Sequence, residues 1–87
     1  MNFQGSVIKE RGITFVVIVV KKYVLDNRTE ANETIDAFRQ QVFPGLPVIL
    51  MAQDSSGHPS YYGRQDIAKF MASVSLSAIP WKEYTIN

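Results

Sequence analysis

The chain has 87 residues, of which 46% are hydrophobic, and its nine Lys and Arg nearly balance its eight Asp and Glu, for a net charge of +1. This length allows one small domain, residues 1–87. The balanced charge argues against nucleic acid or an anionic membrane as a partner. The absence of cysteine excludes disulfides, thiol catalysis, zinc–thiolate sites and iron–sulfur clusters.

The longest apolar run, residues 13–20, is too short to cross a bilayer, which takes about 20 residues. No small-residue cleavage site follows it, so it does not read as a signal peptide. We therefore expect a soluble, unprocessed chain. A chain without disulfides fits the cytoplasm, and no cofactor is expected.

The first 24 residues predict two strands joined at residues 10–12, with the sequence ERG. The second strand, from residue 13 to about residue 24, is rich in Val, Ile and Phe, which suit a pleated surface. Because its apolar residues are consecutive rather than alternating, both of its faces should be buried, as in a central strand of an α/β sheet.

A helix is predicted to begin after Asn27, a favourable N-cap residue, because Glu30 three residues later completes the spacing of a capping box. It should end before Pro44, which disfavours helical geometry in the residue that precedes it. One apolar stripe with a 3.6-residue period is expected to be buried, and it consists of Ala31, Ile35, Phe38 and Val42. The opposite face is polar and carries Glu30, Glu33, Asp36, Arg39 and Gln40.

A third strand is predicted after Pro47, which should occupy its first position because proline lacks a backbone donor. Asp54 and Gly57 are typical of the first and fourth positions of a type I turn. A short strand returns from that turn, and Pro59 places it at a sheet edge.

Gly63 is predicted to cap a second helix, with Asp66 in its first turn, where the helix dipole favours negative charge. Its apolar stripe is expected to be buried and consists of Ile67, Phe70, Met71 and Val74. Residues 81–86 predict a possible last short strand. The fold class is therefore α/β, a small mixed sheet in the order β-β-α-β-β-α.

Residues 52–66 hold the candidate ligand-binding side chains His58, Tyr62 and Arg64. Histidine has a suitable pKa for a general base, but no nucleophile and orienting acid accompany it, and an exposed turn residue is the commoner role. With Asp54 it offers only two weak metal ligands, where catalytic zinc usually has three. An anion held by Arg64 and the first amides of the second helix is the sharpest ligand hypothesis.

Two aromatic residues near the end of the chain are candidates for an interface. Trp81 follows Pro80 and belongs to a type enriched in binding hot spots, and Tyr84 lies three residues further on. The alternative for Trp81 is a place in the core under the second helix.

Residues 13–74 resemble the C-terminal half of thioredoxin-like folds. In that family a Gly-x-Pro precedes a strand, the proline bond is cis and a glycine opens the last helix, as residues 45–48 and Gly63 suggest here. The resemblance implies a cis bond between Leu46 and Pro47. The family's Cys-x-x-Cys motif is missing, which argues against oxidoreductase activity. Residues 47–67 also resemble short bacterial proteins of no established activity.

Two strands that are apolar on both faces need more cover than two helices provide, and a homodimer would supply it. We therefore expect a non-enzymatic interaction or regulatory domain that acts as a homodimer. The alternative is a protein that binds a small molecule or an anion, with or without catalysis, through residues 58–64.

Overall fold

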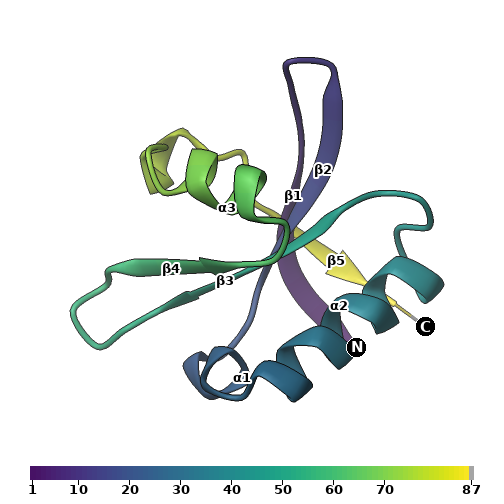
Figure 1. The fold of residues 1–87 in the computed structure, drawn as a ribbon, viewed down its shortest axis with the longest axis horizontal. Coiled ribbons are helices and arrows are strands. Elements are labelled where there is room, and N and C mark those ends of the chain that lie inside the picture. Colours follow the sequence, from purple (N-terminus) through teal and green to yellow (C-terminus); the bar gives the residue numbers. More distant parts are fainter. Residues whose placement is uncertain (87) are drawn as a thin grey trace.

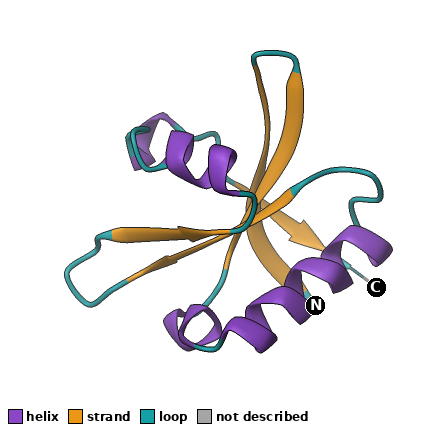
Figure 2. Ribbon diagram, in the orientation of Figure 1, coloured by secondary structure: helices purple, strands orange, loops and turns teal. Residues whose placement is uncertain are grey.

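The chain forms a mixed five-stranded sheet with helices on both faces (Figure 1, Figure 2). The computed structural model describes residues 1–86. The strands are β1 (Asn2–Glu10), β2 (Ile13–Val19), β3 (Val48–Gln53), β4 (Pro59–Tyr62) and β5 (Lys82–Thr85). The helices are α1 (Lys22–Asp26), α2 (Arg28–Gln41), α3 (Gln65–Met71) and the 3₁₀ turn η1 (Leu76–Ala78). The predicted α/β class and the final short strand are confirmed.

The strands lie in the order β4-β3-β2-β1-β5. β2 and β3 are parallel, with Val16 opposite Val48, and the chain between them forms α1 and α2. The other three neighbouring pairs are antiparallel. The proline-containing strand β4 lies at one edge of the sheet, as predicted, because Pro59 has no amide to donate to a further strand.

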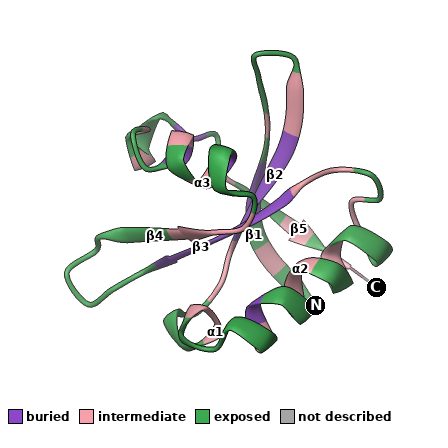
Figure 3. Cartoon of the chain, viewed as in Figure 1, coloured by how far each residue is buried: buried purple, intermediate pink, exposed green. Residues whose placement is uncertain are grey.

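Two separate cores fill the spaces between the sheet and the helices. Odd and even positions of β2 and β3 point to opposite faces, so each strand supplies both cores. The core under α2 is built from Val16, Ile18, Ala31, Val48 and Leu50. The core under α3 is built from Phe15, Val17, Ile49, Met51, Ile67, Met71 and Ile79. The predicted two-sided burial of these strands is confirmed, and Figure 3 shows it where β2 and β3 cross the centre.

β2 is shorter than predicted, because it ends at Val19 rather than near residue 24. Its last partner in β3 is Met51, opposite Val19, although β3 itself continues to Gln53. The chain turns instead into α1, where the ammonium of Lys22 lies 2.9 Å from a carboxylate oxygen of Asp26.

α2 begins as the capping pattern predicts. The side-chain oxygen of Asn27 accepts a hydrogen bond of 3.0 Å from the amide of Glu30. Ala31 is fully buried. Phe38 of α2 and Phe70 of α3 are of intermediate exposure, and each packs against the core under its own helix, as the predicted apolar stripes require.

The bond between Leu46 and Pro47 is trans, since no peptide bond in the described part of the chain is cis. The cis bond implied by the thioredoxin resemblance is therefore wrong. Pro47 also lies just before β3 instead of inside it. Its carbonyl accepts a hydrogen bond of 3.0 Å from Val16, so it extends the pairing of β2 without needing an amide.

The β1–β2 hairpin turns through Arg11 and Gly12, which both have positive φ, 51° and 79°. Glu10 pairs with Ile13, so the loop has two residues. Two-residue loops with positive φ at both positions favour Asn-Gly, because most other side chains are strained in the left-handed region. Arg11 therefore carries local strain.

Replacing Arg11 with Asn is expected to stabilise the fold by about 1 kcal/mol, because Asn tolerates a positive φ better. Gly12→Ala should instead destabilise it, through backbone strain alone, since a Cβ there meets nothing within 4 Å. Urea denaturation followed by circular dichroism measures both changes. An Arg11→Asn midpoint at or below that of the parent protein would contradict the strain.

Candidate functional site

A groove of about 540 Å³ lies between α2 and the junction of β4 with α3. Ten residues from α2, the start of β3 and that junction line it, and three of them are arginines. The lining consists of Arg28, Asn32, Ile35, Arg39, Pro47, Val48, Tyr62, Gly63, Arg64 and Gln65.

α2 supplies one wall of the groove through residues spaced four, three and four apart. This spacing places side chains on one face of a helix. The four residues of this wall are Arg28, Asn32, Ile35 and Arg39. Ile35 also packs against the core under α2. The three polar residues of this wall therefore lie beside a side chain that is held in the core.

The facing wall depends on Gly63, which links β4 to α3. Its φ is +147°, and a Cβ there would lie 2.8 Å from Ile49 Cδ1 and 3.0 Å from the Val48 carbonyl oxygen. Only glycine allows this approach, which brings the start of α3 against the start of β3. The sequence predicted that Gly63 caps α3. The N-cap residue is instead Arg64, one position later.

Tyr62 joins the two walls. Its hydroxyl donates a hydrogen bond of 2.8 Å to the side-chain oxygen of Asn32. The ring of Tyr62 also packs against the core under α2. The groove therefore has a fixed width at this point.

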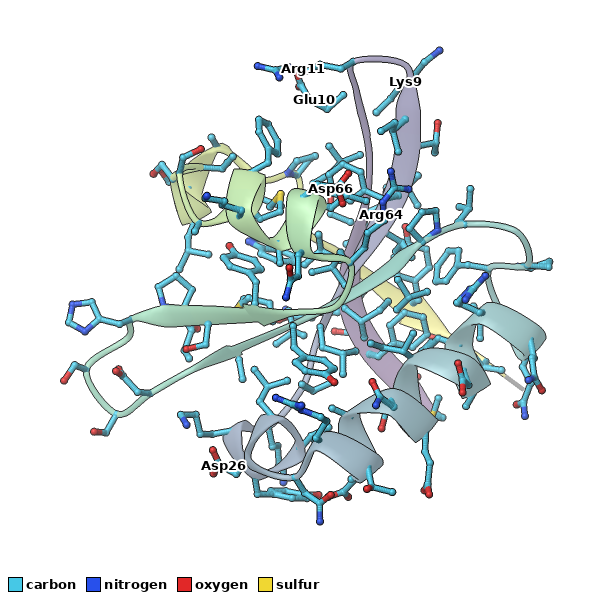
Figure 4. All side chains as sticks on the ribbon, in the orientation of Figure 1. Lys9, Glu10, Arg11, Asp26, Arg64 and Asp66 are labelled. Atoms are coloured by element: carbon cyan, nitrogen blue, oxygen red, sulfur yellow. The ribbon has the colours of Figure 1, made fainter. Side chains whose placement is uncertain are left out.

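Arg64 is oriented by its neighbour Asp66. The Arg64 Nε donates a hydrogen bond of 2.9 Å to a carboxylate oxygen of Asp66, and the two side chains meet at the start of α3 (Figure 4). Because this contact uses Nε, the two terminal nitrogens of the guanidinium stay available to a ligand.

The groove concentrates positive charge in a chain that is otherwise nearly neutral. Three of the nine basic residues line it, and no carboxylate does. Among residues 1–86 the ion pairs are Lys22–Asp26, His58–Asp54 and Arg64–Asp66. Arg28 and Arg39 belong to none of these pairs.

The structure brings Tyr62 and Arg64 together but leaves His58 outside the groove lining. The His58 side chain is 82% exposed in the β3–β4 turn. Amide groups of His58 and Ser56 donate to a carboxylate oxygen of Asp54, and the His58 amide is the main cause that lowers the pKa of Asp54. These contacts are the ones expected of a turn.

Tyr61 points to the other face of the sheet from Tyr62 and packs against the core under α3. Its hydroxyl is buried and has no hydrogen-bond partner within the described chain. Burial raises the pKa of the Tyr61 phenol above its ordinary value of 10.0. Below that pH the phenol is neutral in both the folded and the unfolded chain, so the shift weakens the fold only in alkali.

The two candidate interface residues are both engaged within the chain. Trp81 is half-buried and packs against the core under α3. Tyr84 stacks on Phe3 with ring centroids 5.1 Å apart, and meets Phe43 edge-on at 5.7 Å.

Within residues 1–86 no three His, Asp or Glu side chains gather closely enough to hold a metal ion. None of the helices formed by these residues has the length and apolar character needed to cross a membrane.

Comparison with known proteins gives no relative for this chain: no family model, no curated protein and no solved structure matches it.

The sequence reasoning missed Arg28, Asn32 and Arg39 as site residues, and placed Arg39 on the solvent face of its helix. The spacing of the three along α2 could have shown that they share a face. It could not have shown that Tyr62 and Arg64 lie opposite, because that depends on the pairing of Leu50 with Tyr62 in the β3–β4 hairpin.

The two tyrosines of β4 are expected to respond oppositely to loss of the hydroxyl. Tyr62→Phe removes a hydrogen bond and should cost about 0.5–1.5 kcal/mol, whereas Tyr61→Phe removes an unpaired buried hydroxyl and should be neutral or stabilising. Denaturant midpoints of the two variants provide the measurement. A Tyr61→Phe variant less stable than Tyr62→Phe would show that the two phenols are wrongly assigned.

Proposed function

We propose that this protein binds an anionic small molecule in the groove between α2 and the β4–α3 junction. The observation that carries the proposal is the set of Arg28, Arg39 and Arg64 around one groove whose lining contains no carboxylate. This retains Tyr62 and Arg64 from the site predicted by sequence and leaves out His58.

Arginine suits this role because its planar guanidinium donates paired hydrogen bonds to carboxylates and phosphates. The volume of about 540 Å³ falls within the range of about 300–1,000 Å³ that is usual for small-molecule sites. Asn32 and Gln65 add neutral hydrogen-bonding groups, which can fix the orientation of a ligand.

The chemistry of the lining supports binding rather than catalysis. It contains no His, Cys, Ser, Thr, Lys, Asp or Glu, the residue types that most often serve as nucleophile or general base. Tyr62 is the one ionisable hydroxyl in the lining, and it is engaged with Asn32. We therefore propose a binding protein that works without catalysis. We propose the cytoplasm as its location because a chain without cysteine fits that compartment.

Arg39→Gln is expected to weaken the binding of pyrophosphate, used as a probe, by at least about tenfold, which corresponds to about 1.4 kcal/mol. A charge-assisted hydrogen bond contributes about this much. Isothermal titration calorimetry at low ionic strength measures the affinity.

The matched control is Arg11→Asn, which removes one arginine from the hairpin tip, away from the groove (Figure 4). General charge loss affects both variants alike, whereas a site in the groove responds only to Arg39. Equal affinities in the two variants, or no binding by the parent protein, would reject the proposal.

A second candidate function is the interaction domain acting as a homodimer that the sequence suggested. The sequence suggested a homodimer because two strands that are apolar on both faces need cover. That reason has weakened, since the central residues of β2 and β3 are buried within a single chain. The large apolar side chains that stay exposed in residues 1–86 are Met1, Val7 and Tyr23. What supports the candidate is that β4 and β5 end the sheet and leave their outer edges open to pairing.

Light scattering over a range of concentrations separates the two candidates. A homodimer formed by edge pairing should show a mass near twice 9.8 kDa at high concentration. If β5 is the paired edge, Glu83 or Thr85 replaced by Pro should then restore the monomer, because the amides of these two residues face away from β1. A mass near 9.8 kDa throughout would reject the homodimer.

A further inference from the structure

The direction of the groove follows from the order of the chain. α2 ends at Gln41 and β3 begins at Val48 after a short loop, so the C-terminal end of α2 lies at the start of β3. The hydrogen bond between Tyr62 and Asn32 shows that the end of β4 lies beside the N-terminal half of α2. Arg39 therefore lies on the Val48 side of this bond, and Arg28 lies on the other side.

Arg64 lies at the same end of the groove as Arg39. Leu50 pairs with Tyr62 in the β3–β4 hairpin, and Gly63 lies against Val48 and Ile49. The residue after Gly63 thus adjoins the start of β3. Two guanidinium groups, one from α2 and one from the start of α3, face this end.

Arg28 stands alone at the opposite end. Eleven residues separate it from Arg39 along α2, a rise of about 16 Å between the two Cα atoms at 1.5 Å per residue. Two arginine side chains that project away from the helix axis keep their guanidinium groups about this far apart. A single phosphate would contact both only if both side chains lay along the helix toward each other, so we treat the two ends as separate anion sites.

The stretch between the two ends carries no charge. Asn32 and Tyr62 lie there with their side chains bonded to each other, and Ile35, which lies between Asn32 and Arg39 on α2, adds apolar surface. This arrangement suits a ligand whose middle is uncharged and partly apolar, with its anionic groups at its ends.

We infer that the ligand of the groove carries two separated anionic groups: a phosphate-like group for Arg39 and Arg64, and a second anion for Arg28. This inference rests on the proposed function and names the class of ligand for the same site. A monoanion or an isolated phosphate would use only half of the groove.

A length series of linear alkane bisphosphonates tests the inference, with an alkyl monophosphonate of the same carbon number as the control at each length. The series runs from about two to about twelve methylene groups. Joining two anions raises affinity only when the linker spans both sites, and most strongly at the matching length. We expect a maximum at the longer lengths, at least about tenfold tighter than the matched monophosphonate.

Two variants assign the ends. Arg28→Gln should abolish the advantage of the bisphosphonate while leaving monophosphonate affinity within about twofold of the parent protein. Arg39→Gln should weaken both probes. Both residues are exposed on α2 and glutamine favours a helix nearly as well as arginine, so circular dichroism should show an unchanged fold.

The outcomes separate the inference from the function on which it rests. If the monophosphonates bind and the second phosphonate adds nothing at any length, the two-anion ligand is rejected and the anion site remains. An advantage that survives Arg28→Gln also rejects it. If neither the monophosphonates nor pyrophosphate bind, the proposed function fails as well.

Discussion

The parallel pairing of β2 with β3 is the constraint on which the rest of this structure depends. Val16 to Val19 lie opposite Val48 to Met51, and the side chains of these residues pack in the two cores, on opposite faces of the sheet. Burying apolar side chains stabilises a fold by roughly 1.5–3 kcal/mol each. Parallel strands need a long connection, and here that connection is α2, the helix that also forms one wall of the groove. The site is thus built from the same crossover that builds the core.

The groove arises where this crossover meets the edge of the sheet. β4 is a short edge strand, so α2 faces a strand end and a tight turn rather than another helix. Gly63 lets the chain pass closely over the start of β3 before α3 begins on the other face. Side chains from both helices can therefore reach the same opening. A bulkier residue at this position would push the walls apart.

Much of the fold could be predicted from local sequence, because the signals are local. The cap at Asn27, the turn at Asp54 and the edge position of Pro59 each depend on neighbours within a few residues. The end of β2 could not be predicted, since the apolar run continues past Val19 and does not mark where the chain leaves the sheet for α1. The trans bond at Pro47 and the presence of Arg39 and Arg64 in the lining of one groove are likewise decided by tertiary geometry.

The hydrogen bond between Tyr62 and Asn32 has a consequence for the mechanical behaviour of the molecule. It is a neutral contact at the surface, so it contributes modestly to stability. It nevertheless connects the β3–β4 hairpin, at the edge of the sheet, to α2. An anion bound by both Arg39 and Arg64 would form a second connection, between α2 and the start of α3. Binding to the folded chain alone raises the melting temperature by mass action, and here it should also slow amide exchange in β4, an edge strand whose one neighbour in the sheet is β3.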